Sequence, residues 1–327
     1  MRILITGGAG YIGSVAVEQS LAAGHDVVVV DSLWRGHRQA VPDDVELREC
    51  DLRDREGIAS VVKDIKPDAI MHFAAAIVVP ESVEDPLLYF DVNTVGSHYL
   101  ITAAINSGVP RFIFSSTAAA YGNTDAEILT EDMPTNPISP YGRSKVMVEQ
   151  MLEWHQKRYD LNVAIFRYFN VAGATERRGE DHDPETHLIP VALQAASGTR
   201  DKFTVFGTDY PTPDGTCIRD YVHVADLADA HILAANWLSS NDWGIFNLGT
   251  TNGLSVQQIV QAVEGVTDRT LPVTVGPRRE GDAARLIASA ERARNILGWN
   301  PKRSTVERMV GSAWDWMHKH PNGYGDR

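Results

Sequence analysis

Tyr141 and Lys145 are spaced so that they can act together as an acid–base pair. They stand four residues apart, and on a helix the side chains at i and i+4 share one face. A free tyrosine titrates near pH 10, so a tyrosine that is basic at neutral pH needs a shift of about 3 pKa units, or roughly 4 kcal/mol. One cation about 4 Å away at an effective dielectric constant near 20 supplies about that much. We predict that Tyr141 is a catalytic base supported by Lys145, the alternative being an ordinary helix start with a solvated Lys145.

The hydroxyl group of Thr117 could bind the same substrate as Tyr141. It ends the run Ser115-Ser116-Thr117, which follows a predicted strand. In open α/β folds, ligands bind at the carboxyl ends of the strands. We expect the Thr117 hydroxyl to hold a substrate oxygen near Tyr141, the alternative being a loop hydroxyl satisfied locally.

A glycine-rich turn near the N-terminus predicts a dinucleotide site. Gly7, Gly10 and Gly13 have a G-x-x-G-x-x-G spacing between a predicted strand and a predicted helix. A side chain there would obstruct the turn, the approach of a pyrophosphate and the packing of helix on strand, and the helix N-terminus attracts the phosphates. Asp31 ends the second strand, where an acidic residue binds ribose hydroxyls and repels a 2′-phosphate, so we predict NAD rather than NADP. Asp51, after the third strand, is a candidate for the adenine amino group or an ordinary strand-end residue.

These residues require a parallel sheet with helices on both faces. Runs rich in β-branched residues alternate with helical patterns, which predicts right-handed crossovers and a doubly wound, Rossmann-type α/β sheet. We place an NAD-binding domain at residues 1–175, with a return segment near 220–250, and a smaller mixed α/β substrate domain at 176–327. The predicted strands are Arg2–Thr6, Val27–Asp31, Val45–Glu49, Ala69–Phe73, Phe112–Ser115 and Val163–Tyr168, and the predicted helices are Tyr11–Ala23, Arg55–Lys63, Pro86–Asn106, Tyr141–Tyr159, Val224–Leu238, Val256–Glu264, Glu291–Leu297 and Val306–Lys319.

Composition narrows the partners. The chain has 327 residues, 43% of them apolar, and a formal net charge of −13, which disfavours nucleic acid and anionic membranes. No apolar run reaches the roughly 18 residues that a membrane span needs, and no signal peptide is recognisable, so we expect a soluble cytoplasmic protein. Cys50 and Cys217 are far apart, without CxxC or His-rich spacing, so we expect reduced thiols and no metal site.

Longer strings make the chain resemble a known family. They are residues 7–14 (GGAGYIGS), 139–145 (SPYGRSK), 167–170 (RYFN), 209–216 (DYPTPDGT), 219–221 (RDY) and 277–282 (PRREGD). Together they resemble the UDP-glucose (UDP-galactose) 4-epimerases of the extended short-chain dehydrogenase/reductase superfamily, over the whole length of the chain.

The resemblance implies an NAD-dependent isomerase that oxidises C4 of a UDP-hexose to a 4-keto sugar, lets the sugar rotate and reduces it on the other face. It implies a homodimer formed through Pro86–Asn106 and Tyr141–Tyr159. In addition to the glycines, Asp31 and Asp51, it places cofactor contacts at Tyr11, Ile12, Leu52, Phe73, Ala74, Asn93, Ser115, Tyr141, Lys145 and Tyr168. It places substrate contacts at Thr117, Tyr141, Asn170, Leu188, Arg219, Arg279, Asp282 and Leu286. Guanidinium groups suit a diphosphate and a carboxylate suits a ribose.

Some positions depart from the family pattern. Thr117 replaces a serine that many relatives carry, Ile77 stands where some have a lysine near the cofactor phosphates, and His187 stands where some have an asparagine beside the substrate phosphates. Leu286 is intermediate in size at a position that lines the sugar pocket, so we expect poor turnover of N-acetylated sugars.

Two other functions compete with the epimerase. A nucleotide-sugar 4,6-dehydratase of the same superfamily usually has an Asp-Glu pair after the threonine, where this chain has Ala118 and Ala119. A catalytically silent NAD-binding regulator would keep the glycine turn and lose the tyrosine or lysine, and both are present here.

Overall fold

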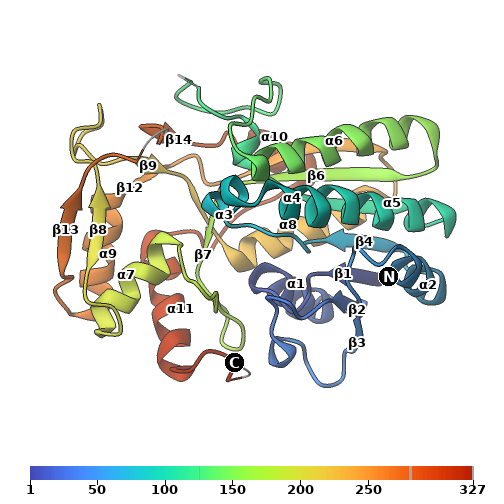
Figure 1. Cartoon of the computed structure of the whole chain (residues 1–327), viewed down its shortest axis with the longest axis horizontal. Helices are drawn as coiled ribbons and strands as arrows, with labels where there is room; N and C mark the ends of the chain where they lie inside the picture. The colour runs from blue at the N-terminus through green and yellow to red at the C-terminus, as the bar shows by residue number, and fades with distance from the viewer. Residues whose placement is uncertain (125, 280–281, 326–327) are drawn as a thin grey trace.

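A seven-stranded parallel sheet forms the centre of the protein, which we describe from a computed structural model covering residues 1–124, 126–279 and 282–325 (Figure 1). Its strand order is β11-β6-β5-β4-β1-β2-β3, so β1 lies between β2 and β4, and Thr6 is in register with Val30 on one side and His72 on the other. The strands are β1 (Arg2–Thr6), β2 (Asp26–Asp31), β3 (Glu46–Glu49), β4 (Ala69–His72), β5 (Arg111–Thr117), β6 (Asn162–Tyr168) and β11 (Trp243–Leu248). The predicted doubly wound parallel fold is confirmed.

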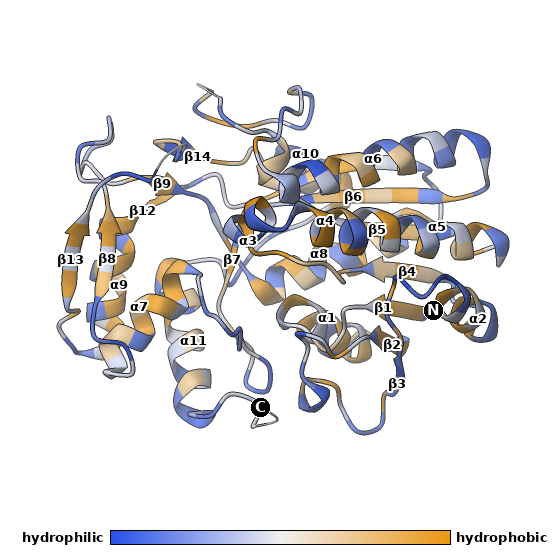
Figure 2. Cartoon of the chain, viewed as in Figure 1, coloured by the Kyte–Doolittle hydropathy of each residue, from blue (hydrophilic) through white to orange (hydrophobic). Residues whose placement is uncertain are grey.

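Both faces of this sheet are buried, and this explains the run of four valines in β2. Val27 and Val29 belong to one hydrophobic cluster, and Val28 and Val30 belong to the cluster on the opposite face. Successive side chains of a strand point to opposite faces, so a strand covered on both sides needs apolar residues throughout. In Figure 2 the strands at the middle of the sheet are coloured largely hydrophobic.

Two sets of helices cover the sheet. α1 and α8 contribute to one hydrophobic cluster, together with α10, while α2, α5 and α6 contribute to the other. Their bounds are α1 (Tyr11–Ala22), α2 (Arg55–Ile65), α3 (Val79–Glu84), α4 (Pro86–Tyr89), α5 (Gly96–Asn106), α6 (Pro140–Arg158), α8 (Val224–Trp237) and α10 (Glu291–Leu297). Among the described residues, no helix is both long and apolar enough to cross a membrane.

A second region has its own hydrophobic cluster and lies beside the sheet in Figure 1. It contains the helices α7 (Leu188–Ser197), α9 (Val256–Thr267) and α11 (Val306–Lys319), and the short strands β8 (Phe203–Phe206), β9 (Ile218–Arg219), β12 (Leu254–Ser255), β13 (Val273–Gly276) and β14 (Arg285–Leu286). β7 (Asn170–Ala172) pairs with β10 (Tyr221–His223), and β11 returns to the edge of the central sheet beside β6. The domain boundary at residue 175 stays a prediction.

The single helix predicted at Pro86–Asn106 is wrong. The structure has α4, then a π-helical turn at Phe90–Val95, then α5. The turn carries Asn93, whose buried amide forms hydrogen bonds outside its own helix, and π turns occur frequently at functional positions of helices.

We also did not predict α3 and α7, which contain Pro80 and Pro190. A proline in the first turn of a helix removes an N–H that has no partner there in any case.

Candidate active site

A cavity of about 440 Å³ lies at the carboxyl edge of the sheet and collects residues from the ends of six of its strands. Gly7 follows β1, Asp31 ends β2, Phe73 follows β4, and Thr117 and Tyr168 end β5 and β6. The predicted site residues that line it are Gly7, Gly10, Tyr11, Ile12, Gly13, Asp31, Asp51, Leu52, Phe73, Ala74, Ser115, Thr117, Tyr141, Lys145, Tyr168 and Asn170. Parallel strands bring their carboxyl ends to one edge, and ligands bind there in this class of fold.

The glycine turn has the close packing that a nucleotide-binding turn requires. A Cβ atom at Gly13 would lie 2.0 Å from the backbone oxygen of Gly7, a distance that no side chain tolerates. α1 begins at Tyr11 without a side-chain cap, so its first backbone N–H groups face the cavity unshared with a capping side chain. Free amides and the helix dipole make this end a site for phosphate.

Asp31 is held at the end of β2 by the same turn. Its carboxylate accepts hydrogen bonds from the backbone N–H of Ala9 at 3.0 Å and of Leu33 at 2.9 Å. Burial raises the pKa of Asp31, while these bonds oppose the rise. The neighbouring Arg35 is paired with Glu81. Asp31 thus places a carboxylate at the cavity wall beside the glycine turn, as expected for a site that binds ribose hydroxyls.

Asp51, which we predicted to contact the adenine, forms an ion pair within the protein. Its carboxylate pairs with Arg53, with an Nη2–Oδ2 distance of 2.6 Å, and this pairing lowers the pKa of Asp51. Both residues line the cavity. Its role toward the adenine amino group stays a prediction.

The start of α6 places Tyr141 beside Thr117. Ser139 caps the helix by accepting a hydrogen bond from the N–H of Gly142 at 3.2 Å. A Cβ atom at Gly142 would lie 2.8 Å from the backbone oxygen of Ala119, so glycine lets the helix pack closely on the turn after β5. The Thr117 side chain hydrogen-bonds Tyr141 and also accepts from the N–H of Ala119 at 3.1 Å.

The charges at this pair correct one part of our electrostatic expectation. Burial raises the pKa of Tyr141, and the hydrogen bond from Thr117 only opposes the rise. Burial also lowers the pKa of Lys145 to about 7, partly offset by Glu149. Lys145 is 4% exposed, and its ammonium donates to the backbone oxygen of Ser115 at 2.9 Å. Among the residues that the structure describes, Lys145 is not one of the groups that lower the pKa of Tyr141, and we propose that the positive ring of an oxidised nicotinamide acts together with Lys145.

Buried polar groups fix the strand ends behind the pair. Glu149 accepts two bonds from Arg167, at 2.7 and 3.1 Å, and one from the hydroxyl of Ser116. A buried ion pair is tolerated when its remaining polar atoms are also bonded. This network ties α6 to β5 and β6 directly beneath Lys145 and Thr117.

Tyr168 and Ser115 belong to a second buried chain. The Tyr168 hydroxyl lies 2.8 Å from Oγ of Ser115 and bonds to Nε2 of His231. Burial lowers the pKa of His231 to about 4, so it is neutral near pH 7, and its Nδ1–H faces the backbone oxygen of Leu227 at 2.9 Å. His231 thus fixes Tyr168 at the cavity wall.

Three comparisons with known proteins agree with this geometry. The family model described as NAD dependent epimerase/dehydratase matches residues 3–249. A UDP-glucose 4-epimerase of Lacticaseibacillus casei is 48% identical over 330 aligned positions that span all of both chains. A crystal structure of a UDP-glucose 4-epimerase has a TM-score of 0.97 at 48% identity and covers 99% of each chain. Another, from Stenotrophomonas maltophila with bound NAD and formylated UDP-arabinopyranose, has a TM-score of 0.94 at 40% identity and covers 98% of this chain and 99% of its own.

The chain belongs to the NAD dependent epimerase/dehydratase family. NAD is its cofactor, as the glycine turn and Asp31 predict. The residues fit this group because the turn offers free amides, Asp31 offers a carboxylate for the ribose, and Tyr141 and Lys145 face the same cavity.

Asn93 lies behind the residues that line the cavity, and its predicted cofactor contact stays a prediction. It is 1% exposed, and its amide bonds the N–H and the carbonyl of Ala76, at 2.8 and 2.9 Å, and Oγ of Ser144 at 3.1 Å. These bonds tie the loop after β4 to α6. Asn93 therefore supports the wall of the cavity without lining it.

The predicted substrate residues divide into two groups. Thr117, Tyr141 and Asn170 line the cavity, whereas Leu188, Arg219, Arg279, Asp282 and Leu286 belong to the second region. Of these, Arg219 pairs with Asp282 and is in register with Leu286 across β9 and β14. The guanidinium of Arg279 lies 4.1 Å from the ring of Phe206, and Leu188 starts α7. Their substrate contacts stay predictions, and Glu280 and Gly281 of the same motif lie outside the described residues.

The sequence analysis missed several cavity residues. Trp34, Arg35 and Arg53 line the cavity near Asp31 and Asp51, and Ile77, one of the departures noted above, lines it as well. Glu180, His182 and His187 line another part of its wall. Glu180, His182, Glu185 and His187 each bring one possible metal-ligating atom within 4.8 Å of the others. The spacing E-x-H-x-x-E-x-H was available as a signal, but we searched for cysteine and histidine patterns only.

Proposed function

We propose that this chain interconverts UDP-glucose and UDP-galactose as an NAD-dependent 4-epimerase. The observation that carries the proposal is the convergence of Thr117, Tyr141 and Lys145 beside the glycine turn in a single cavity. Relatives named UDP-glucose 4-epimerase that match over the whole chain support the choice of substrate.

The side chains divide the work at the sugar. Tyr141 takes the proton of the 4-hydroxyl group while Thr117 holds the same oxygen, and the charge of Lys145 stabilises the phenolate. The chemistry that bound NAD supplies is reversible acceptance of a hydride from C4. Removal of the proton and the hydride gives a 4-keto sugar; return of the hydride to the opposite face of C4 and of the proton from Tyr141 to the 4-oxygen inverts the configuration at C4.

The nucleotide has to stay bound while the sugar rotates. We propose that Asn170, Arg219 and Arg279 hold the diphosphate and that Asp282 contacts the uridine ribose. Guanidinium groups bind phosphate with fixed geometry, so a strong grip on the diphosphate is compatible with a loose grip on the sugar. The pairing of Arg219 with Asp282 supports this assignment because it holds the two side chains next to each other.

A 4,6-dehydratase is the competing reaction in this superfamily, and the turn after Thr117 argues against it. Ala118–Ala120 form a tight turn that packs against Gly142. That turn offers no acid or base to remove water from the sugar.

We also propose that the protein is a cytoplasmic homodimer that pairs through α6 and the helices before it. Met147, Met151 and Trp154 form a stripe at i, i+4 and i+7 on α6, and Trp154 is 71% exposed. Leu87, on α4, is 81% exposed. Exposed apolar faces of this kind mark protein interfaces.

Product analysis tests the proposed function. The purified protein is incubated with UDP-galactose and NAD, and the nucleotide sugars are separated by chromatography. We expect UDP-glucose to form until both sugars are present at equilibrium. A 4-keto-6-deoxy product would indicate the dehydratase, and unchanged UDP-galactose would indicate a silent NAD-binding protein.

A further inference from the structure

The segment between β7 and α7 gathers four side chains that the proposed reaction does not use. Within the eight residues 180–187 lie Glu180, His182, Glu185 and His187, and one donor atom from each comes within 4.8 Å of the other three. The side chains of Glu180 and Glu185 are only 7% and 6% exposed. Two buried carboxylates facing two imidazoles need an explanation, because an unpaired buried charge is costly.

We propose that these four residues bind one Zn²⁺ ion, which fixes the segment 173–187 in the wall of the active-site cavity. Imidazole nitrogen and carboxylate oxygen are both zinc ligands, and four such ligands make a closed, tetrahedral structural site. Two carboxylates balance the charge of the ion and leave both imidazoles neutral.

Four distances between donor atoms lie near those in a tetrahedral ion, with a different oxygen of Glu185 facing each imidazole. Nδ1 of His187 lies 2.8 Å from Oε1 of Glu180 and 3.1 Å from Oε1 of Glu185. Nδ1 of His182 lies 3.1 Å from Oε1 of Glu180 and 3.8 Å from Oε2 of Glu185. Zinc bonds of about 2.0–2.2 Å in a tetrahedron place the ligand atoms about 3.3–3.6 Å apart. His187 is the most exposed of the four, at 44%, so its ring has room to adjust.

The segment that carries the ligands is already held at fixed points. The backbone N–H of Tyr324 donates to Asp181 at 3.0 Å, and the Tyr324 hydroxyl accepts from the N–H of Gly179 at 3.1 Å. The carboxylate of Glu185 accepts from the backbone N–H groups of Thr186 and His187, both at 2.7 Å. Groups that orient the ligands in advance strengthen a metal site.

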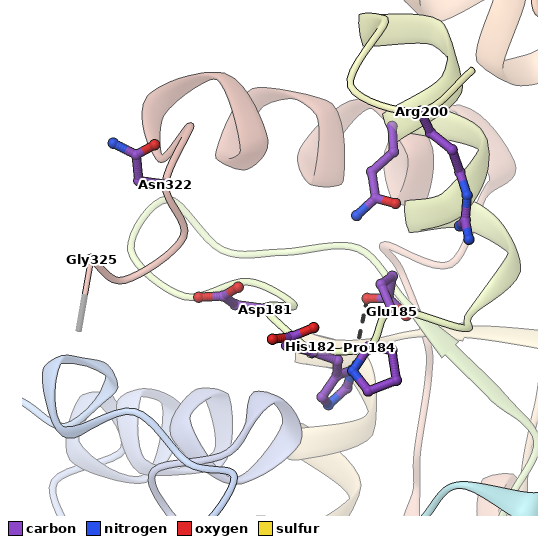
Figure 3. A pocket seen from close by; sticks show the side chains of 9 residues that line it. Asp181, His182, Pro184, Glu185, Arg200, Asn322 and Gly325 are labelled. Carbon is purple, nitrogen blue, oxygen red and sulfur yellow. Dashed lines mark ion pairs between the residues drawn. The ribbon is translucent and has the colours of Figure 1, made fainter. Parts of the chain in front are cut away.

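A second cavity gives a cation a route to the cluster from the outside. It has a volume of about 420 Å³, and His182, which also lines the active-site cavity, lines it together with Asp181, Asp183 and Glu185. Figure 3 shows the side chains of His182 and Glu185 at its wall. Arg200 is the only lysine or arginine among the described residues that line it. His182 therefore lies between an acidic entrance and the active-site cavity.

In the absence of a metal, protons have to take its place. Burial lowers the pKa of His187, but Glu180 and Glu185 more than offset this and raise it well above its ordinary value. The same contacts with His187 and His182 lower the pKa of Glu180 to about 2 despite its burial. A protonated His/Glu network is the alternative that the experiment has to exclude.

Zinc binding by the full chain tests the proposal. The tag-free protein is stripped with a chelator, desalted and titrated with Zn²⁺ in competition with a chromophoric chelator. We expect one Zn²⁺ per chain, a higher melting temperature with Zn²⁺, and slower hydrogen exchange in residues 173–187. A protein that binds less than one equivalent, or whose segment exchanges at the same rate with and without Zn²⁺, would overturn the proposal in favour of the protonated network.

Variants assign the site. Removing both imidazoles with His182→Ala and His187→Ala should lower the zinc affinity about 100-fold or more. Glu180→Gln nearly keeps the shape of the side chain and should also weaken binding, with an unchanged circular dichroism spectrum. His318→Ala, at an exposed position on α11, is the matched control and should bind zinc like the wild type. Wild-type zinc affinity in both the double variant and Glu180→Gln would refute the assignment. These measurements need no turnover, so they are independent of the proposed epimerase activity.

Discussion

Replacing Lys145 with methionine should separate two effects of its buried amine: a lower free energy of unfolding and the support of Tyr141 in catalysis. Burial lowers the pKa of Lys145 from 10.5 to about 7. At about 1.4 kcal/mol per pKa unit, keeping this buried amine protonated costs the folded state about 5 kcal/mol. Methionine fills a similar volume and has no amine to charge, so Lys145→Met should be more stable than the wild type below pH 7.

The pH dependence gives the sign of this effect. Between the folded pKa near 7 and the unfolded pKa of 10.5, the unfolded chain binds more protons at Lys145 than the folded chain does. The wild type therefore gains stability as the pH rises through this window, and its Lys145 penalty is complete only below about pH 7. Two pH units above the folded pKa recover about 3 kcal/mol, so the stability advantage of Lys145→Met should shrink by that amount between pH 6 and pH 9.

Urea unfolding of both nucleotide-free proteins at pH 6, 7, 8 and 9 measures the difference directly. His231 titrates in both proteins and cancels in the comparison. The pKa of His72 is lowered to about 3 by burial and by Lys145, so in the folded wild type this side chain is neutral throughout the range from pH 6 to pH 9. Lys145→Met should also lose most of its turnover, with the residual activity shifted to higher pH, because Tyr141 loses a neighbouring cation. Parallel stability curves for the two proteins would refute the burial of a titrating amine, and an unchanged pH–rate profile would refute its support of Tyr141.

Four further substitutions probe the other parts of the site. Tyr141→Phe should lower kcat by about 10²- to 10⁴-fold while NAD and UDP still bind by calorimetry, because it removes only the base; more than a tenth of wild-type turnover contradicts that role. Asp31→Ala should weaken NAD and relax the preference over NADP, and unaltered Kd values for both remove Asp31 from the site. Leu286→Ala should narrow the kcat/KM gap between UDP-galactose and UDP-N-acetylgalactosamine, since overpacking by an N-acetyl group costs about 1–3 kcal/mol, or roughly 5- to 150-fold; an equal ratio in both proteins means that Leu286 does not gate the pocket. Trp154→Glu should dissociate the dimer into monomers, so light scattering should give the variant half the mass of the wild type. An equal mass for the two proteins would place the interface elsewhere.

Local sequence signals predicted the part of the site that lies on the sheet. Gly7, Gly13 and Asp31 belong to one strand–helix–strand unit, and Tyr141 and Lys145 belong to one turn of a helix, so their spacing places them. Parallel strands then bring Thr117 and Tyr168 to the same edge. The place of Thr117 needed only the order of strands and helices, whereas the role of Tyr168 came from the family resemblance.

Features that depend on the three-dimensional surroundings could not be found this way. The raised pKa of Tyr141 follows from burial by segments far away in the sequence. No local pattern indicated that the amide of Asn93 bonds Ala76 and Ser144, which are 17 and 51 residues away. The cluster around His182 escaped because a metal pattern was sought among cysteines and histidines, although Glu180 and Glu185 supply half of the donor atoms.

The fate of deuterium at C4 of the sugar tests the central claim most directly. UDP-galactose labelled with deuterium at C4 is incubated with the protein, and the product is examined by mass spectrometry and NMR. If Tyr141 removes a proton from oxygen while the C4 hydrogen leaves and returns as hydride, the UDP-glucose formed carries the deuterium at C4. Loss of the label to water, its transfer to C6 with release of a 4-keto-6-deoxy sugar, or failure to form UDP-glucose would contradict the account.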